Sequence, residues 1–505
     1  MSEFGGDKKV IYRILNLTGG LNTKIGRWLI PDNQIYQGQD ADTTKGGIRK
    51  QPGTSKLSAT AIGATPVKTL YRIYQNDASN TRKFVASSGT KLWLYNTSTG
   101  IFDSLATGFT TDLQWSMVYW NGKVYMTNGT DTPQKYDLST VAAMTGPAVN
   151  CKEFAVSNDR FWACGNATNP NRVYFSGFSN AESWGATDYL SVPENSINGK
   201  AVGFGKLLGR LVVFCEDSIS LIYGTDIYSF IVKTTETRIG CVAPKTIKNL
   251  NGLLYFLGKD GVYVFNGVRA VKVSKIIQAT IDDINQTYVT NAVAEVVGDK
   301  YILSYTSTAA GGTVNNRTLI LDTSVGEVLA EDIYGSWQGP LTVGFSSFSV
   351  WRGAGDLNEV YGGSSASDGF VYKLFTGTDY AGSNIDMDVV TKDIDFGDDA
   401  IIKYFERLTV VAEVEGDYDI VVSYATDNNS SWTTLATINL ASSGVKRGTM
   451  EDGTITRNVI VYPIVFTGNV TGYYIRFRIR QNGIGCSAVI RGMKLEAKSA
   501  TQSGR

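Results

Sequence analysis

Short runs of apolar and aromatic residues recur along the middle of the chain, and most of them lie next to a tight Gly, Asn or Asp turn. These runs occupy residues 91–95, 123–126, 160–163, 210–214, 253–257, 301–305 and 371–375. Units of roughly 45 residues, each built from several short strands, are typical of the blades of a β-propeller. The pattern therefore predicts an all-β chain with a β-propeller of six or seven irregular blades over residues 66–380.

The segments on either side of this region have different patterns. Residues 1–65 show little helical periodicity, and Gly-Gly and Pro-Gly pairs predict sharp turns between short extended pieces. We expect an extended N-terminal segment, called the clasp segment below. Residues 385–498 contain evenly spaced strand patterns, which predict a C-terminal antiparallel β-sandwich, and residues 499–505 form a tail.

Three local features interrupt the repeating strands. Residues 274–284 place four isoleucines on one face, which predicts a helix with Ser274 as its N-cap. Residues 166–198 and 306–317 are polar and rich in turn residues, so we expect two long loops on the faces of the propeller.

The composition agrees with an all-β chain and excludes some classes of binding partner. The 505 residues are 43% hydrophobic and include 54 Gly but only 10 Pro. Because 47 basic residues balance 47 acidic ones, general attraction to nucleic acid or to an anionic membrane is not expected. No apolar run is long enough to span a membrane and the N-terminus has no apolar leader, so we expect no membrane insertion and folding in a cytoplasm.

The residue types needed for common catalytic sites are scarce. Histidine is absent, which excludes Ser-His and Cys-His nucleophile systems. The five cysteines include no C-x-x-C pair and are expected to be reduced and mostly buried. We therefore expect no catalytic residues, no cofactor and no metal site; Asp- and Asn-rich turns leave open a structural calcium ion, although no D-x-D-x-D-G loop occurs.

Two basic clusters are candidates for contacts with a partner. Residues 1–60 carry nine Lys or Arg against five Asp or Glu, and Lys45, Arg49 and Lys50 lie in this segment. On residues 473–480, Arg476, Arg478 and Arg480 alternate with apolar residues. The leading segment could contact a phosphate-rich or acidic partner, and the three arginines could bind phosphate, a carboxylate or an acidic neighbouring subunit. The alternative in both cases is a solvated strand face, paired in the second case with the carboxylates Glu413, Glu415, Asp417 and Asp419.

Several acidic patterns have a structural interpretation. Residues 427–432 resemble the Asp-box turn of sialidases, which stabilises a hairpin and does not catalyse, although Asn429 stands where that motif has Gly. The pairs Asp282-Asp283 and Asp398-Asp399 would suit a glycosidase only if two carboxylates faced one cleft. Adjacent residues point in different directions, so the pairs alone do not predict such a site.

The order of several motifs resembles a family of bacteriophage tail hub or nozzle proteins, which includes the packaged-DNA stabilisation proteins, or head-completion stoppers, of short-tailed phages. The sequence motifs that carry this resemblance are Gly19-Gly-Leu-Asn-Thr23, Gly46-Gly-Ile-Arg-Lys-Gln-Pro-Gly53, Val213-Phe-Cys-Glu-Asp-Ser-Ile-Ser-Leu-Ile-Tyr-Gly224, Arg238-Ile-Gly-Cys-Val-Ala-Pro244 and residues 249–265. Each motif alone is short, and it is their order over nearly the whole chain that resembles the family.

The resemblance implies a structural virion protein without catalytic residues. Six copies would form a homo-oligomeric ring in the tail, below the portal and adaptor proteins, after assembly in the host cytoplasm. The ring would close the DNA channel, retain the packaged genome, let DNA pass through its lumen without specific binding, and dock tail fibres or spikes outside. The alternative function is a glycan-binding or glycan-degrading propeller of the tail, such as a lectin or a tailspike-like enzyme.

Overall fold

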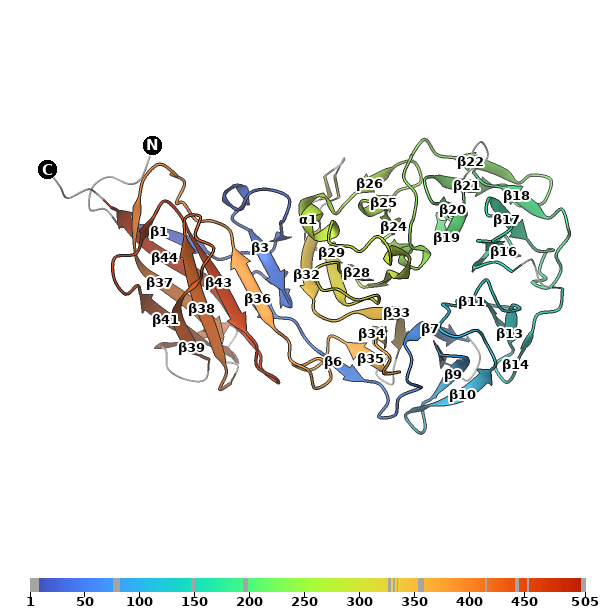
Figure 1. Ribbon diagram of the computed structural model, residues 1–505, viewed down its shortest axis with the longest axis horizontal. Coiled ribbons are helices and arrows are strands. Elements are labelled where there is room, and N and C mark those ends of the chain that lie inside the picture. Colours follow the sequence, from blue (N-terminus) through green and yellow to red (C-terminus); the bar gives the residue numbers. More distant parts are fainter. Residues whose placement is uncertain are drawn as a thin grey trace.

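The computed structural model describes residues 9–500 of the chain, apart from 76–81, 147–149, 194–198, 326–327, 330–331, 334, 353–357, 414–415, 441–444 and 452–453. Most of the predicted tail and Glu415 therefore lie outside the described residues. A ring of small sheets forms one half of the molecule, and a two-layered β unit forms the other (Figure 1). The first and last described strands, β1 (Lys9–Ile14) and β44 (Val489–Ser499), lie side by side on the side of the two-layered unit that faces away from the ring (Figure 1).

Six separate four-stranded antiparallel sheets form blades of the ring. Their strands are β7 (Val67–Tyr74), β8 (Arg82–Ser88), β9 (Lys91–Asn96) and β10 (Ile101–Thr107); β11 (Ser116–Trp120), β12 (Lys123–Thr127), β13 (Gln134–Tyr136) and β14 (Val141–Ala143); β15 (Glu153–Ser157), β16 (Arg160–Cys164), β17 (Arg172–Phe175) and β18 (Tyr189–Ser191); β19 (Ala201–Leu207), β20 (Arg210–Cys215), β21 (Ile219–Tyr223) and β22 (Ile231–Thr234); β23 (Lys248–Leu250), β24 (Leu253–Gly258), β25 (Gly261–Phe265) and β26 (Ala270–Lys272); and β33 (Phe345–Arg352), β34 (Asn358–Ser364), β35 (Val371–Leu374) and β6 (Thr54–Lys56).

The remaining position in the ring is filled by strands of a larger sheet. These are β27 (Val293–Val297), β28 (Lys300–Tyr305), β29 (Arg317–Asp322) and β32 (Ser336–Leu341). Strand β27 contacts both β23 and β33, so this sheet stands between the neighbouring blades. The predicted β-propeller is therefore confirmed, with six free-standing blades and a further one that continues beyond the ring.

Hydroxyl groups on the innermost strands connect neighbouring blades. The Thr69 hydroxyl accepts a hydrogen bond from the backbone N–H of Trp115 (2.8 Å), and the Ser116 hydroxyl accepts one from Phe154 (3.0 Å). At the other side of the first blade, the Ser347 hydroxyl donates to the backbone oxygen of Val67 (2.6 Å). The ring is closed by β6, which comes from the clasp segment and completes the last blade by pairing with β35.

The larger sheet has ten strands and extends from the ring into the two-layered unit. Beyond β32 it continues through β2 (Gly20–Leu21), β3 (Gln34–Gln39), β36 (Met387–Thr391), β43 (Ile475–Gln481), β38 (Asp419–Thr426) and β39 (Thr433–Asn439). The short strand β2 is parallel to both β32 and β3, which places clasp residues at the junction of the two halves. One hydrogen-bonded sheet therefore links the propeller to the C-terminal unit.

A second sheet packs on the distal strands of the first and completes the predicted sandwich. It contains β1 (Lys9–Ile14), β4 (Ala41–Asp42), β5 (Ile48–Lys50), β37 (Lys403–Glu413), β40 (Val445–Glu451), β41 (Thr454–Val465), β42 (Thr471–Gly472) and β44 (Val489–Ser499). The core between the two sheets includes the fully buried Leu408 and Leu495 from one and Phe477 and Ile479 from the other. Four clasp strands, β1, β3, β4 and β5, belong to this sandwich, so the clasp segment is bound to both halves of the molecule.

Two local predictions were wrong. The helix expected over 274–284 is a 3₁₀ turn, Lys275–Ile277, followed by one α turn, α1 (Gln278–Ile281), and the Ser274 hydroxyl accepts a hydrogen bond from Val262 N–H instead of capping it. Residues 166–198 are not one loop, because β17 and β18 lie within them and complete a blade. The other short elements are η1 (Arg27–Leu29), η2 (Pro244–Thr246), η4 (Val289–Asn291), β30 (Val328–Leu329) and β31 (Asp332–Ile333).

A cluster of charges fixes β1 to β44 and β37. The carboxylate of Glu496 is 2% exposed and lies close to Lys9 (3.1 Å), Arg407 (2.7 Å) and Lys494 (2.9 Å). Burial by itself raises the pKa of Glu496, but the hydrogen bonds from these three cations outweigh it and lower the pKa from 4.5 to about 2. A carboxyl group whose pKa is lowered in the folded state stabilises the fold above its unfolded pKa and loses that contribution as the pH falls towards the folded pKa.

We expect Glu496→Gln to lower the free energy of unfolding above about pH 4.5, and the difference from the unaltered protein to shrink between about pH 4.5 and pH 2. The expected loss at neutral pH is about 1–2 kcal/mol, because solvent screens the partly exposed cations. Urea unfolding at several pH values measures it. The exposed Glu236, changed to Gln, is the matched control, and an equal loss in both variants would contradict the assigned cluster.

Candidate functional site

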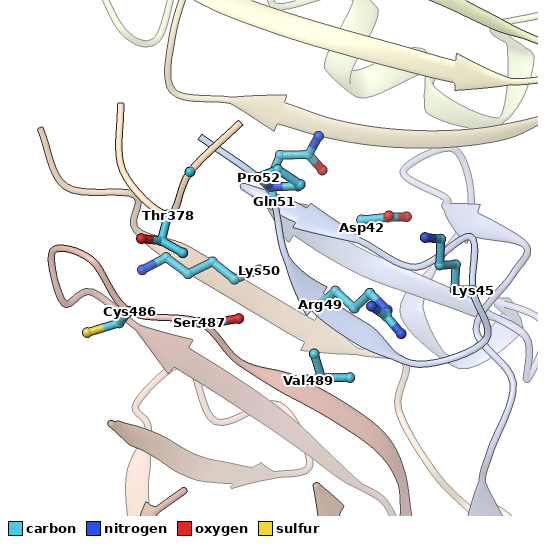
Figure 2. A pocket seen from close by; sticks show the side chains of 11 residues that line it. Asp42, Lys45, Arg49, Lys50, Gln51, Pro52, Thr378, Cys486, Ser487 and Val489 are labelled. Carbon is cyan, nitrogen blue, oxygen red and sulfur yellow. The ribbon is translucent and has the colours of Figure 1, made fainter. Parts of the chain in front are cut away.

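A basic pocket lies where the clasp segment meets the C-terminal unit, and it brings together three of the six predicted contact residues. Its volume is about 220 Å³. Residues from the β4–β5 hairpin, from the stretch after β35 and from the turn before β44 surround it (Figure 2). Lys45, Arg49 and Lys50 all line this basic pocket, and Asp42 is the only carboxylate among its lining residues in the described part of the chain.

The shape of the hairpin follows from its glycines and its Asp turn. The Asp42 carboxylate accepts hydrogen bonds from the backbone N–H (2.9 Å) and the hydroxyl (2.6 Å) of Thr44, which fixes the start of the turn. Gly46 has φ +88°, a conformation that favours glycine. A Cβ on Gly47 would lie 2.3 Å from the backbone oxygen of Ile490, so only glycine lets this hairpin approach β44 so closely.

Lys50 lies in the wall of the pocket with little exposure. Its residue exposure is 7%, and its ammonium donates a hydrogen bond to the backbone oxygen of Gly483 (2.9 Å). Burial lowers the pKa of Lys50, because desolvation penalises the charged form. In Figure 2 the Lys50 side chain points towards Thr378 and Cys486, at one end of the pocket.

Arg49 and Lys45 lie at the other end of the pocket, near Asp42 (Figure 2). Successive residues of a strand point to opposite faces, which explains why Arg49 and Lys50 diverge. Within the described residues, neither Arg49 nor Lys45 forms an ion pair. The basic pocket therefore holds three positive charges against one carboxylate that is already hydrogen-bonded within its own turn.

The other three predicted residues, Arg476, Arg478 and Arg480, are buried or paired with carboxylates of the same chain, so they are less available to a partner. Arg476 is 2% exposed and donates to the backbone oxygen of Asp427 (2.8 Å), so its interpretation as a contact residue was wrong. Arg478 and Arg480 are partly exposed and bind Asp388 (2.9 Å) and Asp386 (3.2 Å). These three arginines hold the sheet and its adjoining turns together.

The carboxylates expected to pair with this strand were also wrong. Strand β43 lies between β36 and β38, and the paired aspartates Asp386 and Asp388 come from the β36 side. Glu413 instead pairs with Arg491, while Asp417 and Asp419 both accept hydrogen bonds from Asn439.

The Asp-box-like turn joins two strands, as a structural interpretation predicts, but not those of its own hairpin. The Asp427 carboxylate accepts a hydrogen bond from the backbone N–H of Tyr473 (2.7 Å), just before β43. The Trp432 ring faces Arg476 and Arg478, with centroid distances of 5.4 and 5.8 Å. This turn therefore binds β38 to β43 and covers Arg476.

The remaining candidates for chemistry are separated. Asp282 accepts a hydrogen bond from Gln278, whereas Asp283 accepts one from Ser307, so the two carboxylates have different partners. No group of three or more Cys, Asp or Glu residues suitable for a metal ion occurs in the described part of the chain. Four cysteines are buried and Cys486 is partly exposed, and burial raises the pKa of the Cys151, Cys215 and Cys241 thiols to about 12.

One contact across the ring, made by Lys245, could not be predicted from any sequence motif. Lys245, in η2 before β23, reaches the inner strands of two other blades, where it contacts Glu153 of β15 (2.9 Å) and the backbone oxygen of Trp115 before β11 (3.3 Å). The blade of β19 separates β23 from both. This contact therefore crosses the inner side of the ring and ties three blades together.

Comparisons with known proteins give no family. No protein-family model and no curated protein matches the chain. Among solved structures, the chain is similar to the computationally designed Ika8 protein, with 10% identity and a TM-score of 0.39 over 63% of this chain and 99% of that one. A likeness of this size carries no argument about function. No helix in the described residues is long and apolar enough to cross a membrane.

Proposed function

We propose that the chain is a structural subunit of a bacteriophage tail hub or nozzle. In this proposal six copies form a ring below the portal and adaptor proteins, which closes the DNA channel and retains the packaged genome. DNA passes through the lumen of the ring without specific binding, and tail fibres or spikes dock outside. The subunit acts in the virion tail without an active site or cofactor, after assembly in the host cytoplasm.

The observation that carries this proposal is the position of the glycine motifs on which the family resemblance rests. Gly20 has φ +69°, and a Cβ there would lie 2.5 Å from the backbone oxygen of Trp337. A Cβ on Gly53 would lie 1.8 Å from the backbone oxygen of Asp379. Gly20 and Gly53 thus allow close backbone contacts where the clasp segment meets the propeller, and Gly47 allows one between the clasp segment and β44. These two motifs therefore coincide with contacts that bind the clasp segment to both halves of the molecule.

The mechanical character of the subunit supports the same role. The ten-stranded sheet passes from one half of the molecule to the other, and β6 of the clasp segment closes the ring of blades. Contacts such as Lys245 with Glu153 tie separate blades together. A subunit of this kind can carry load between neighbours in a ring, since its halves cannot separate without breaking backbone hydrogen bonds.

Ring formation is the test of this proposal. We expect the purified protein to give ring-shaped particles in negative-stain images, alone or after addition of the portal and adaptor proteins of the same phage, with a sedimentation mass that is a multiple of 54.8 kDa. Cryo-electron microscopy of the intact particle should place this mass in a symmetric ring below the portal. A monomer that releases reducing sugar from host polysaccharide and is absent from such a ring would support the glycan-degrading alternative instead.

A further inference from the structure

We infer that the basic pocket is a binding site for a phosphate-type oxyanion. The inference rests on the side chains that line the pocket, and it holds whether or not the chain is a tail hub subunit. A pocket of about 220 Å³ accommodates such an anion together with a few water molecules.

The ammonium group of Lys50 is incompletely paired. An ammonium group has three N–H donors, and the described part of the chain offers this one a single acceptor, the backbone oxygen of Gly483. The side chain is more than nine-tenths buried. A buried charge is costly unless an opposite charge or several hydrogen bonds compensate it. An anion beside Lys50 would supply both.

The carboxylates whose charge acts on Lys50 are engaged with other groups. Asp40, Asp386 and Asp379 all act on the Lys50 charge from a distance, but no ion pair joins them to it in the described residues. Asp40 binds Thr342 and Tyr380, Asp386 binds Arg480, and Asp379 accepts from the backbone N–H of Gly382. None of these groups is free to neutralise Lys50.

The other walls of the basic pocket are also positively charged. Arg49 and Lys45 add two positive charges that face the same pocket without an ion-pair partner in the described residues. Hydrogen phosphate or a phosphomonoester offers several oxygens that can accept hydrogen bonds from these cations.

Cys486 provides a local reporter of this site. It lies in the wall of the basic pocket, and it is the one cysteine of the chain that is not buried. We expect inorganic phosphate to slow the reaction of Cys486 with a thiol reagent, relative to chloride at equal pH and ionic strength. At ten times the Kd, where about nine-tenths of the sites are filled, the expected slowing is about tenfold.

Charge-removing variants locate the binding. Arg49→Gln and Lys50→Met should each raise the phosphate concentration that gives half-maximal protection by about tenfold, the effect of losing a hydrogen bond to a charged group. Lys206→Gln, an exposed basic residue of β19, is the matched control and should leave it unchanged. Thermal unfolding shows whether each variant folds; if Lys50→Met does not, Arg49→Gln alone decides.

A single-stranded oligonucleotide distinguishes the two sources of the phosphate group. Protection by inorganic phosphate but not by the oligonucleotide supports a site for the free anion. Protection by the oligonucleotide at a concentration of phosphate groups below the inorganic phosphate concentration that gives the same protection supports a site for backbone phosphates. Equal reaction rates in phosphate and chloride, or an equal effect of Lys206→Gln and Arg49→Gln, would overturn the inference.

Discussion

Replacing Asp40 by Ala is expected to destabilise the protein by about 3–5 kcal/mol, because three partly buried donors lose their buried acceptor together. Asp40 is fully buried between β3 and β4. Its carboxylate accepts hydrogen bonds from the backbone N–H (2.9 Å) and the hydroxyl (2.6 Å) of Thr342, and from the hydroxyl of Tyr380 (2.5 Å). Thr342 precedes the first strand of the last blade and Tyr380 follows its third, so one side chain of the clasp segment holds the propeller at two points.

Two variants make this prediction specific. Asn at position 40 keeps one oxygen acceptor and tolerates the positive φ of +47°, so Asp40→Asn should lose only about 1–2 kcal/mol. Asp103→Ala removes an exposed carboxylate that accepts a hydrogen bond from Asn96, and it should stay within about 0.5 kcal/mol of the unaltered protein. Urea unfolding measures all three. Similar losses for Asp40→Ala and Asp103→Ala would show that the joint does not depend on this carboxylate.

The propeller could be predicted because the central strands of its blades are covered on both faces. The runs at 123–126, 160–163 and 210–214 became the second strands β12, β16 and β20, in which nearly every residue is buried. Strands with both faces buried are apolar at consecutive positions and stand out in a sequence. Strands β17 and β18 have only four and three residues, and β18 is incompletely buried, which is why this stretch resembled a loop.

The joint between the halves could not be predicted from local patterns. Strand β2 has two residues, and its partner in the ring is Trp337, far along the chain. The charge surplus of the leading segment did point to Lys45, Arg49 and Lys50, but the groups that surround Lys50 come from the other end of the sequence. Cys486 and Gly483 lie in the turn before β44 and carry no signal of their own.

The error at Arg476 has a similar cause. Alternation along β43 shows correctly that the apolar residues Ile475, Phe477 and Ile479 share one face, and all three are fully buried. It does not show whether the opposite face is exposed. Here the Asp427 turn covers Arg476, whose guanidinium charge is compensated by Asp393 (3.4 Å) and by backbone oxygens. The alternation along a strand shows which residues share a face, but tertiary packing decides which face is exposed to solvent.

The second large effect is expected at Gly53, which immediately precedes β6, the strand that closes the ring. Its N–H donates to the backbone oxygen of Gly377, and its own oxygen accepts from Thr376 N–H, both at 3.0 Å. A Cβ at this position would lie 1.8 Å from the Asp379 oxygen, so the backbone of one of the two segments must move. We therefore expect Gly53→Ala to cost about 3 kcal/mol or more, at the upper end of overpacking effects, and to loosen β6 from β35.

Gly122→Ala is the matched control for this change, because it adds the same methyl group with no atom within 4 Å. Its φ of +77° limits the expected cost to about 1 kcal/mol. Hydrogen exchange should show faster exchange at β6 and β35 in Gly53→Ala and no change there in Gly122→Ala, and thermal unfolding should rank the two variants in the same order. If Gly53→Ala is no less stable than Gly122→Ala, the closure of the propeller does not depend on the close approach at Gly53, and the glycine motifs lose their structural explanation.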